Sequence, residues 1–597
     1  MGKVNKRNKR SKNVNKQVQK IQSTKFQNLI KDLDQTVIPN DRLAFLSQLN
    51  LMILQNTGKD NITMNDCKQV IDLIVNKLIS DNNTTIKIES VGVLRNVILL
   101  INESNKENNL IKYLWDQKSL WDILKNGMDN STISLNNLIE KKSDVSIKID
   151  EYEMLVDYID NLMHILTMVL TNEDSEDVMI DFLNNDDKLD DTCKFILKNF
   201  EYCLNGNNKY NYKLLNAVLE FLYEFSSQSL QFLEYLFTKM PELLNIVKSL
   251  NLTVSSVKDS EFKKMFNVLL IGLLIQVSEL ENTSSEQLGS YLKNIMDNSQ
   301  NLDYENTKSV NIMEISLDLI IADLENIGEK LEKGEINSNN EDLHNVLINI
   351  LPSYLNNLYD TLKTSKDKNS SLIIRLLLCW NNYILLSGAN IYEQNELIQY
   401  ITNIIQINEE VDNLVDYKLT TLQTLIEVDC NKFVQSVLIK NGNNFIKMND
   451  VNNINANDSF CEQIMTMYLK ETSDLEIRQK IVDILINFMK INSSNLSNVG
   501  KFLLSLINIE KDQQLLIKIF YKIFEMFGLD EEDIRSNQSI YFDKMELDQV
   551  YENLKIQDKL TDISKNLNQL KTIIQDKQSM RELTNNLNGF LQYKLYN

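Results

Sequence analysis

The chain has 597 residues, too many for one compact core, so several domains or a repeat array are expected. Only 14 residues are Gly and 3 are Pro, which argues against an all-β protein and against a nucleotide-binding α/β protein with glycine in its phosphate loops. The formal net charge of −21 gives a surface that repels nucleic acid and anionic membranes and attracts basic proteins.

The first 20 residues differ from the rest, because they contain eight Lys or Arg and no acidic residue. We expect residues 1–24 to be a disordered tail, since nothing in them can form a core. Either the tail only aids solubility or it is a nuclear-import signal, and a confined basic cluster on an acidic protein favours the signal. The residues predicted to bind a karyopherin are Lys3, Lys6, Arg7, Lys9, Arg10 and Lys12.

The stretch Thr85–Leu124 shows the period of a helical repeat. Apolar residues recur every three or four positions on one face of its first helix, namely Ile88, Val91, Leu94, Ile98 and Ile101. Glu89, Gly92 and Asn96 fall on the opposite face. A helix pair of this size needs neighbours to bury its apolar stripe, and this predicts one unit of an armadillo or HEAT array.

Similar apolar helices recur along the chain at spacings of about 40–60 residues. They are predicted at Leu155–Leu170, Tyr212–Phe225, Phe262–Val277, Leu372–Leu386, Tyr417–Val428, Leu475–Met489 and Leu515–Phe527. The more polar tail Met545–Asn597 is also helical in pattern and is expected to cap the array. The predicted fold is therefore an all-α, armadillo/HEAT-repeat superhelical solenoid.

Polar segments at Ile139–Asp150 and Asn172–Asp191 interrupt the pattern, and a larger acidic one at Asp303–Asn345 has eleven acids against three Lys. We interpret 25–302 as N-terminal armadillo-like repeats, 303–345 as an acidic mid-chain insertion with one short amphipathic helix, and 346–597 as C-terminal HEAT-like repeats with a helical cap. The insertion is either a flexible surface loop or a carboxylate-rich helix that imitates a phosphate backbone toward an RNA-binding protein. The residues predicted to bind such a protein are Glu314, Asp318, Asp323, Glu325 and Glu329.

A solenoid groove lined by Trp and Asn can hold an extended peptide, because Asn bonds its main chain and Trp covers aliphatic stems. The candidates for such a groove are Glu89, Asn96, Trp380 and Asn381. The alternative is that Trp115, Trp121 and Trp380 are plain core residues, and three Trp cannot supply the repeated ladder of importin-alpha.

Catalytic and metal-binding motifs are not found in the sequence. The chain has two His, of which His164 lies in an apolar helix and is expected to be a core residue, and it has no HExxH, GxGxxG, GxxxxGK[ST] or GxSxG motif. Its six Cys form no CxxC pair, which is typical of reduced thiols in a cytosolic or nuclear protein. We expect neither a signal peptide nor a membrane span, and no enzymatic activity, metal or cofactor.

Four segments together resemble the symportin family of synchronized-import adaptors, in its fungal form, whose animal counterpart is a HEAT-repeat protein. They are the basic start MGK…KRNKRSK, VIPNDRLAFLSQL, IESVGVLRNV and YLWDQKSLWDIL, and they cover about the first 125 residues. The length, the helical pattern and the acidic segment agree with the family over the remainder.

The resemblance implies a chaperone and import adaptor for two newly made large-subunit ribosomal proteins that bind 5S ribosomal RNA, the eukaryotic proteins numbered five and eleven. It would shuttle between cytoplasm and nucleus as a monomer, carried by a beta-type karyopherin, and deliver both proteins for 5S ribonucleoprotein and 60S assembly. One protein's N-terminal segment would lie in the groove, and the other would dock on the acidic insertion. No direct nucleic-acid or membrane contact is implied.

The chain departs from the family in its import signal, which is of the proline–tyrosine type in symportins. None of Pro39, Pro241 and Pro352 precedes a Tyr, so only the basic half of such a signal is present. The alternative interpretation is a cytosolic α-solenoid scaffold or assembly factor without a transport role.

Overall fold

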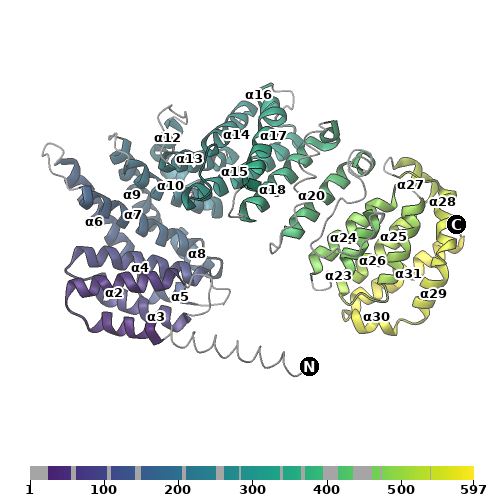
Figure 1. Cartoon of the computed structure of the whole chain (residues 1–597), viewed down its shortest axis with the longest axis horizontal. Coiled ribbons are helices and arrows are strands. Elements are labelled where there is room, and N and C mark those ends of the chain that lie inside the picture. Colours follow the sequence, from purple (N-terminus) through teal and green to yellow (C-terminus); the bar gives the residue numbers. More distant parts are fainter. Residues whose placement is uncertain are drawn as a thin grey trace. The chain divides into compact units, whose positions relative to one another are not determined.

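A computed structural model shows the chain as helices joined by turns (Figure 1). It describes residues 24–55, 62–103, 109–140, 149–204, 210–250, 261–280, 284–336, 341–364, 370–393, 414–433, 460–470, 474–491, 493–537 and 540–596, and no strand occurs among them. Helices from successive repeats pack against one another, so the predicted all-α solenoid of the armadillo/HEAT type is confirmed.

The described residues form two compact units. Unit 1 contains the chain up to residue 283 together with 297–301, and unit 2 contains 284–296 and the chain from 302 onward.

Unit 1 begins with a helix over 24–35. Its other helices are α2 (Pro39–Leu54), α3 (Met64–Leu73), α4 (Thr84–Asn102), α5 (Leu110–Lys112), α6 (Leu120–Glu140), α7 (Ile149–Leu170), α8 (Glu176–Leu183), α9 (Asp186–Leu204), α10 (Tyr210–Gln228), α11 (Leu230–Lys239), α12 (Pro241–Ser249) and α13 (Glu261–Leu280). Single π-helical turns, Ile74–Leu78 and Tyr113–Gln117, continue α3 and α5. The ladder helices of unit 1 are α2, α4, α7, α10 and α13, each of which packs against the next.

Helix α4 illustrates why these segments are helical and how they pack. The Asn83 side chain caps its first turn by accepting hydrogen bonds from the backbone N–H groups of Thr85 and Ile86, at 2.9 and 3.3 Å. The predicted apolar face is buried at Val91, Leu94, Ile98 and Ile101, and Ile88 is half-buried. Truncating one such residue to Ala typically costs about 2–5 kcal/mol of unfolding free energy, so this stripe fixes α4 between α2 and α7.

Unit 2 holds most of α14 (Ser285–Ser299) and the helices that follow. They are α15 (Thr307–Glu332), α16 (Glu341–Asn345), α17 (Leu351–Thr364), α18 (Ser370–Ser387), α20 (Leu414–Val428), α21 (Cys430–Phe433), α23 (Phe460–Lys470), α24 (Leu475–Met489), α25 (Ser493–Leu506), α26 (Gln513–Phe527), α27 (Glu531–Ser536), α28 (Lys544–Asn553), α29 (Ile556–Lys565), α30 (Asn568–Ile573) and α31 (Lys577–Tyr596). A π-helical turn, Val346–Ile350, joins α16 to α17, and a 3-10 turn, Gly388–Glu393, follows α18. The ladder helices of unit 2 are α15, α18, α20 and α24.

Two acidic segments that were expected to interrupt the array are helical within the described residues. Asn172–Asp191 contains a 3-10 turn, all of α8 and the start of α9. Helix α15 lies inside the predicted insertion but has 26 residues instead of one short stretch, and it packs against α18 like any other ladder helix. Its apolar face is buried at Ile312, Leu319, Ile320 and Leu324.

All six cysteines are free thiols, and all but the half-buried Cys430 are buried. Within the described residues, no helix combines the length and the apolar character that crossing a bilayer requires.

Candidate functional site

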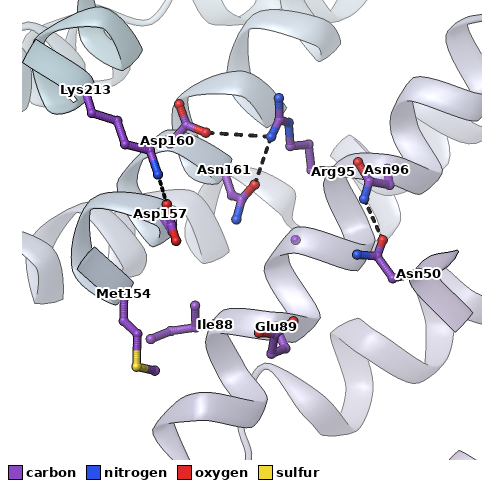
Figure 2. A pocket seen from close by; sticks show the side chains of 11 residues that line it. Asn50, Ile88, Glu89, Arg95, Asn96, Met154, Asp157, Asp160, Asn161 and Lys213 are labelled. Carbon is purple, nitrogen blue, oxygen red and sulfur yellow. Dashed lines mark hydrogen bonds and ion pairs between the residues drawn. The ribbon is translucent and has the colours of Figure 1, made fainter. Parts of the chain in front are cut away.

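A pocket with a cavity volume of about 400 Å³ lies on unit 1, and four ladder helices line it. Its lining residues come from α2 (Asn50), α4 (Ile88, Glu89, Gly92, Arg95, Asn96), α7 (Met154, Asp157, Asp160, Asn161) and α10 (Lys213). The two groove residues that were predicted on this part of the chain, Glu89 and Asn96, are both among them (Figure 2).

Two neighbouring helices present residues to the pocket at the same spacing, i, i+3 and i+7, which keeps them on one helix face. They are Glu89, Gly92 and Asn96 on α4, and Met154, Asp157 and Asn161 on α7. Helix α2 adds Asn50, whose side chain contacts that of Asn96. We call Asn50, Asn96 and Asn161 the asparagine ladder.

The asparagine side chains of the ladder use only some of their hydrogen-bond donors and acceptors. Asn96 Nδ2 donates to Asn50 Oδ1 at 2.5 Å, and Arg95 Nη1 donates to Asn161 Oδ1 at 3.3 Å (Figure 2). Within the described residues, the amide nitrogens of Asn50 and Asn161 and the Oδ1 atom of Asn96 have no hydrogen-bond partner. These donors and this acceptor are the groups that a peptide main chain needs.

The charges in the pocket are balanced except at one residue. Arg95 Nη1 lies 3.6 Å from Asp160 Oδ2, and Lys213 forms an ion pair with Asp157. The Glu89 carboxylate is exposed and has no ion-pair or hydrogen-bond partner among the described residues. Two cations against three anions leave the lining with a net charge of −1, and that charge belongs to Glu89.

His164 and Glu220 lie next to Asp160 and form a second group of ionisable side chains. His164 Nδ1 donates to the Asp160 carbonyl oxygen at 2.8 Å, and Nε2 lies 3.1 Å from the Glu220 carboxylate. Burial lowers the pKa of His164, but the hydrogen bond and charge of Glu220 outweigh it and hold the pKa above its ordinary value. The expected core histidine is half-buried, and its ring links Asp160 of α7 to Glu220 of α10. No group of three or more His, Cys, Asp or Glu suited to a metal occurs in the described part of the chain.

Four of the five residues predicted to bind a ribosomal protein share one face of α15, and we call them the acidic stripe. Asp318, Glu325 and Glu329 are exposed, and Glu314 is half-buried. Arg375 of α18 contacts two of them, with Nη1 3.4 Å from Glu314 and Nε 2.8 Å from Asp318. Glu325 accepts a hydrogen bond from Asn382, and Glu329 pairs with Lys333 at 3.1 Å.

The fifth residue, Asp323, does not face solvent, and the prediction that it contacts a partner is wrong in this fold. Its side chain is fully buried, and neither carboxylate oxygen has a hydrogen-bond partner among the described residues. Burial raises its pKa to about 8. The reason is its position on the helix, because Asp323 follows Ile320 by three residues and precedes Ile327 by four, which places it on the apolar face.

Of the two predicted groove residues of α18, Trp380 does not line a groove. Trp380 is fully buried, with its ring against Tyr383 at a centroid distance of 5.7 Å. Asn381 is half-buried and accepts a hydrogen bond from Thr424 of α20. Both residues belong to the packing of unit 2, whereas Glu89 and Asn96 belong to unit 1.

The predicted karyopherin-binding residues, Lys3, Lys6, Arg7, Lys9, Arg10 and Lys12, lie outside the described residues. Conversely, the structure adds Asn50, Asn161 and Met154 to the candidate site. The shared i, i+3, i+7 spacing on α4 and α7 is a sequence signal for them, but it identifies a site only once the two helices are known to be neighbours.

Comparison with known proteins identifies one relative over the full length. No family model matches the chain. It is 24% identical over 637 residues to synchronized import protein 1 of Saccharomyces cerevisiae, a match that covers 98% of this chain and 95% of the relative.

Solved structures with related helical arrangements include importin beta crystallised in an ammonium sulfate condition, with a TM-score of 0.41 and 11% identity over 79% of this chain. The match spans about half of the importin beta chain, 53%. Kap121p bound to Pho4p gives a TM-score of 0.37 and 12% identity, over 95% of this chain and 71% of that one. The sequence match extends through both units and is not confined to the N-terminal segments, so the predicted resemblance of this chain to the symportin family of synchronized import proteins is confirmed.

Proposed function

We propose that this protein is a non-enzymatic nuclear-import adaptor and chaperone. It binds two newly made large-subunit ribosomal proteins that associate with 5S ribosomal RNA, escorts them together into the nucleus, and delivers them for 5S ribonucleoprotein and 60S assembly. The observation that carries the proposal is the similarity to a synchronized import protein over 98% of this chain and 95% of the relative.

The charge of the chain supports clients of this kind. Ribosomal proteins that bind RNA are basic, and a protein of net charge −21 attracts them without competing for RNA. The acidic stripe on α15 offers carboxylates in a row, and carboxylates bind Arg and Lys as phosphates do. The pocket of unit 1 offers a second kind of surface, suited to an extended segment.

The N-terminal basic cluster is proposed to recruit a beta-type karyopherin. It contains Lys and Arg without a Pro-Tyr element, because none of the three prolines precedes a tyrosine. The charge of the cluster is opposite to that of the body, so a transport receptor with an acidic surface would bind the tail and leave the acidic surfaces for clients.

Co-purification from growing cells tests the proposal. The tagged full-length chain is expected to enrich the two 5S-binding ribosomal proteins over all other ribosomal proteins. Enrichment of neither protein would contradict the client assignment.

The same experiment tests the acidic stripe with point substitutions. Deleting 303–345 would remove α15 and its buried face from unit 2, so a double variant, Glu325→Gln with Glu329→Gln, is the better probe. Recovery of one client is expected to fall while the other is retained. Glu525→Gln on α26, an exposed carboxylate away from α15, is the matched control. Equal recovery in all three proteins would exclude the stripe as a client site.

Nuclear accumulation distinguishes an adaptor from a cytosolic scaffold. Replacing the six basic residues from Lys3 to Lys12 by Gln removes the charge of the predicted karyopherin-binding residues and leaves the described residues unchanged. We expect nuclear accumulation of a fluorescent fusion to be lost, with client binding unchanged. Unchanged accumulation would favour the scaffold.

A further inference from the structure

We infer that α28 and α31 of unit 2 form a docking site for an acidic segment of a partner protein. The residues of this basic docking site are Lys544 and Met545 of α28 and Lys594 and Leu595 of α31. The inference goes beyond the proposed function and is independent of it, because the partner is opposite in charge to the ribosomal proteins.

The two lysines of the basic docking site share one carboxylate oxygen. Lys544 Nζ lies 3.0 Å from Asp548 Oδ1, and Lys594 Nζ lies 3.3 Å from the same atom. Their other neighbours among the described residues are uncharged, since Lys544 donates to the Leu529 carbonyl oxygen at 3.0 Å and Lys594 lies 4.8 Å from the centre of the Tyr551 ring. Two positive charges therefore meet one negative charge, and one positive charge is left without a counter-ion.

The surplus positive charge is costly because Lys594 is buried. Its side chain is only 5% exposed, whereas Lys544 and Asp548 are half-buried and open the cluster to solvent on the side of α28. Burial lowers the pKa of Lys594, and the charge of Lys544 lowers it further. An ion pair that only joined α28 to α31 would need one lysine, since a buried charge without a counter-ion destabilises the fold. A carboxylate from outside the chain supplies the missing negative charge.

Exposed apolar side chains flank the two lysines. Met545 is 65% exposed and Leu595 is 70% exposed, which places both among the most exposed large apolar side chains of the described residues. Met545 precedes Asp548 by three residues on one face of α28, and Leu595 directly follows Lys594. Exposed apolar side chains that gather in one place mark contact sites on soluble proteins. These two can cover an apolar residue that stands next to the bound carboxylate.

The charge of the chain favours an acidic partner at this site over a basic one. The net charge is −21, so most of the surface repels an acidic segment, whereas two lysines that face one carboxylate attract it. A basic segment meets surplus positive charge here and finds carboxylates elsewhere, for example on the acidic stripe. The basic docking site therefore selects a partner by the opposite chemistry.

Selection from a peptide library without Lys and Arg tests the inference, because such peptides gain nothing from the acidic surfaces. The full-length protein is immobilised and offered random peptides of this composition on a neutral display scaffold. We expect the recovered peptides to share Asp or Glu next to a large apolar residue, and to bind more weakly as salt is added. Recovery of no peptide, or of peptides without a shared acid, would overturn the inference.

Lys594→Met separates binding from packing, with the affinity of one recovered peptide and the midpoint of denaturant unfolding as the two readouts. Loss of the surplus charge is expected to weaken the peptide about tenfold, the lower end for a hydrogen bond to a charged group, and to raise the unfolding midpoint. A role in packing alone predicts a lower midpoint with unchanged affinity, and that result would refute the site. Lys559→Met, which removes an exposed lysine of α29 outside the site, is the matched control.

Asp548→Asn provides the reciprocal arm, because it removes the carboxylate that competes with the ligand. We expect it to tighten the same peptide about tenfold and to lower the unfolding midpoint. Equal affinities of the parent, Lys594→Met and Asp548→Asn would exclude the two lysines as the binding groups.

A second copy of this chain is the alternative source of an acidic segment, and sedimentation velocity of the full-length protein tests it. We expect the same monomeric species for the parent and for Lys594→Met. A dimer of the parent that Lys594→Met dissociates would overturn the assignment to a partner protein.

Discussion

Glu510, in the turn between α25 and α26, is a buried carboxylate with a full set of partners. It accepts hydrogen bonds from Arg478 Nη1 at 2.6 Å, from the Tyr468 hydroxyl, and from the backbone N–H groups of Lys511 and Asp512 at 2.9 and 2.8 Å. Burial raises its pKa, but these donors outweigh burial and hold the pKa below the usual range. The folded state therefore gains stability from this group above about pH 4.3, and loses it as pH falls through the lowered pKa.

Glu510→Gln tests this network. The substitution leaves Arg478, which is largely buried, without its counter-charge, and we expect a loss of about 3 kcal/mol in the free energy of unfolding of unit 2. Denaturant unfolding at pH 7 measures it. Glu525→Gln, which breaks an exposed pair with Lys522, should change stability by less than about 0.5 kcal/mol. Equal effects of the two substitutions would contradict the role given to burial.

Asp323 is the opposite case, a buried carboxylate without partners. Its pKa is about 8 in the folded protein and about 3.9 in the unfolded chain. The folded state therefore holds a proton that the unfolded chain has released between these values, and the stability of unit 2 falls as pH rises from about 4 to 8, by up to about 1.4 kcal/mol per pH unit. Asp323→Asn should remove this slope. Unfolding curves at pH 5, 6, 7 and 8 measure it, and parallel pH profiles for the two proteins would show that Asp323 is not the source.

At the scale of elements, two helical glycines have different surroundings. A Cβ at Gly127 of α6 would come within 2.9 Å of Leu162 and 3.0 Å of Tyr158, both on α7, whereas one at Gly589 of α31 meets nothing within 4 Å. The first glycine sets how closely α6 and α7 approach, and the second only weakens its helix.

Alanine substitution separates these two roles. We expect Gly127→Ala to destabilise unit 1 by about 1–3 kcal/mol through overpacking, and Gly589→Ala to stabilise unit 2 by up to about 1 kcal/mol through helix propensity. Thermal unfolding of both variants beside the parent measures the signs. A stabilising Gly127→Ala would mean that α6 moves away from α7 without cost.

The ladder helices were the elements that the sequence predicted best. The predicted range Leu475–Met489 has the bounds of α24, and Leu155–Leu170 differs from α7 only at its start. Their strong apolar period comes from burial between neighbours, which is why it is visible in the sequence. Acidic segments were harder. The sequence predicted a short amphipathic helix within 303–345, but not its full length or its packing in the array, because a charged solvent face is also typical of an insertion.

At the scale of the whole molecule, the pocket was only partly predictable. The face of α4 that carries Glu89 and Asn96 follows from helical period alone. Asn50 and Asn161 lie 46 and 65 residues from Asn96, and such unequal repeat lengths do not reveal which side chains meet. Trp380 was assigned to a groove by residue type, but in unit 2 its size is used to fill the core.

The thiols provide a test of the whole fold. Burial raises the pKa of Cys67, Cys193, Cys203, Cys430 and Cys461 to about 12, and that of Cys379 well above its ordinary value. At pH 8 about one thiol in 10,000 is then the reactive thiolate. We expect a maleimide to label none of the six cysteines in the native protein and all of them in guanidinium chloride, as counted by intact mass. Rapid native labelling at one position would locate an opening in the array.

Arg375 would affect how a basic partner dissociates from the acidic stripe. A basic partner that docks on Glu314 or Asp318 competes with Arg375 for the same carboxylates, so each contact it gains is offset by one that the protein loses. As the partner withdraws, Arg375 closes the pair again, which lowers the barrier to dissociation. A surface of this kind would exchange basic ligands quickly and would transfer them readily to a stronger polyanion.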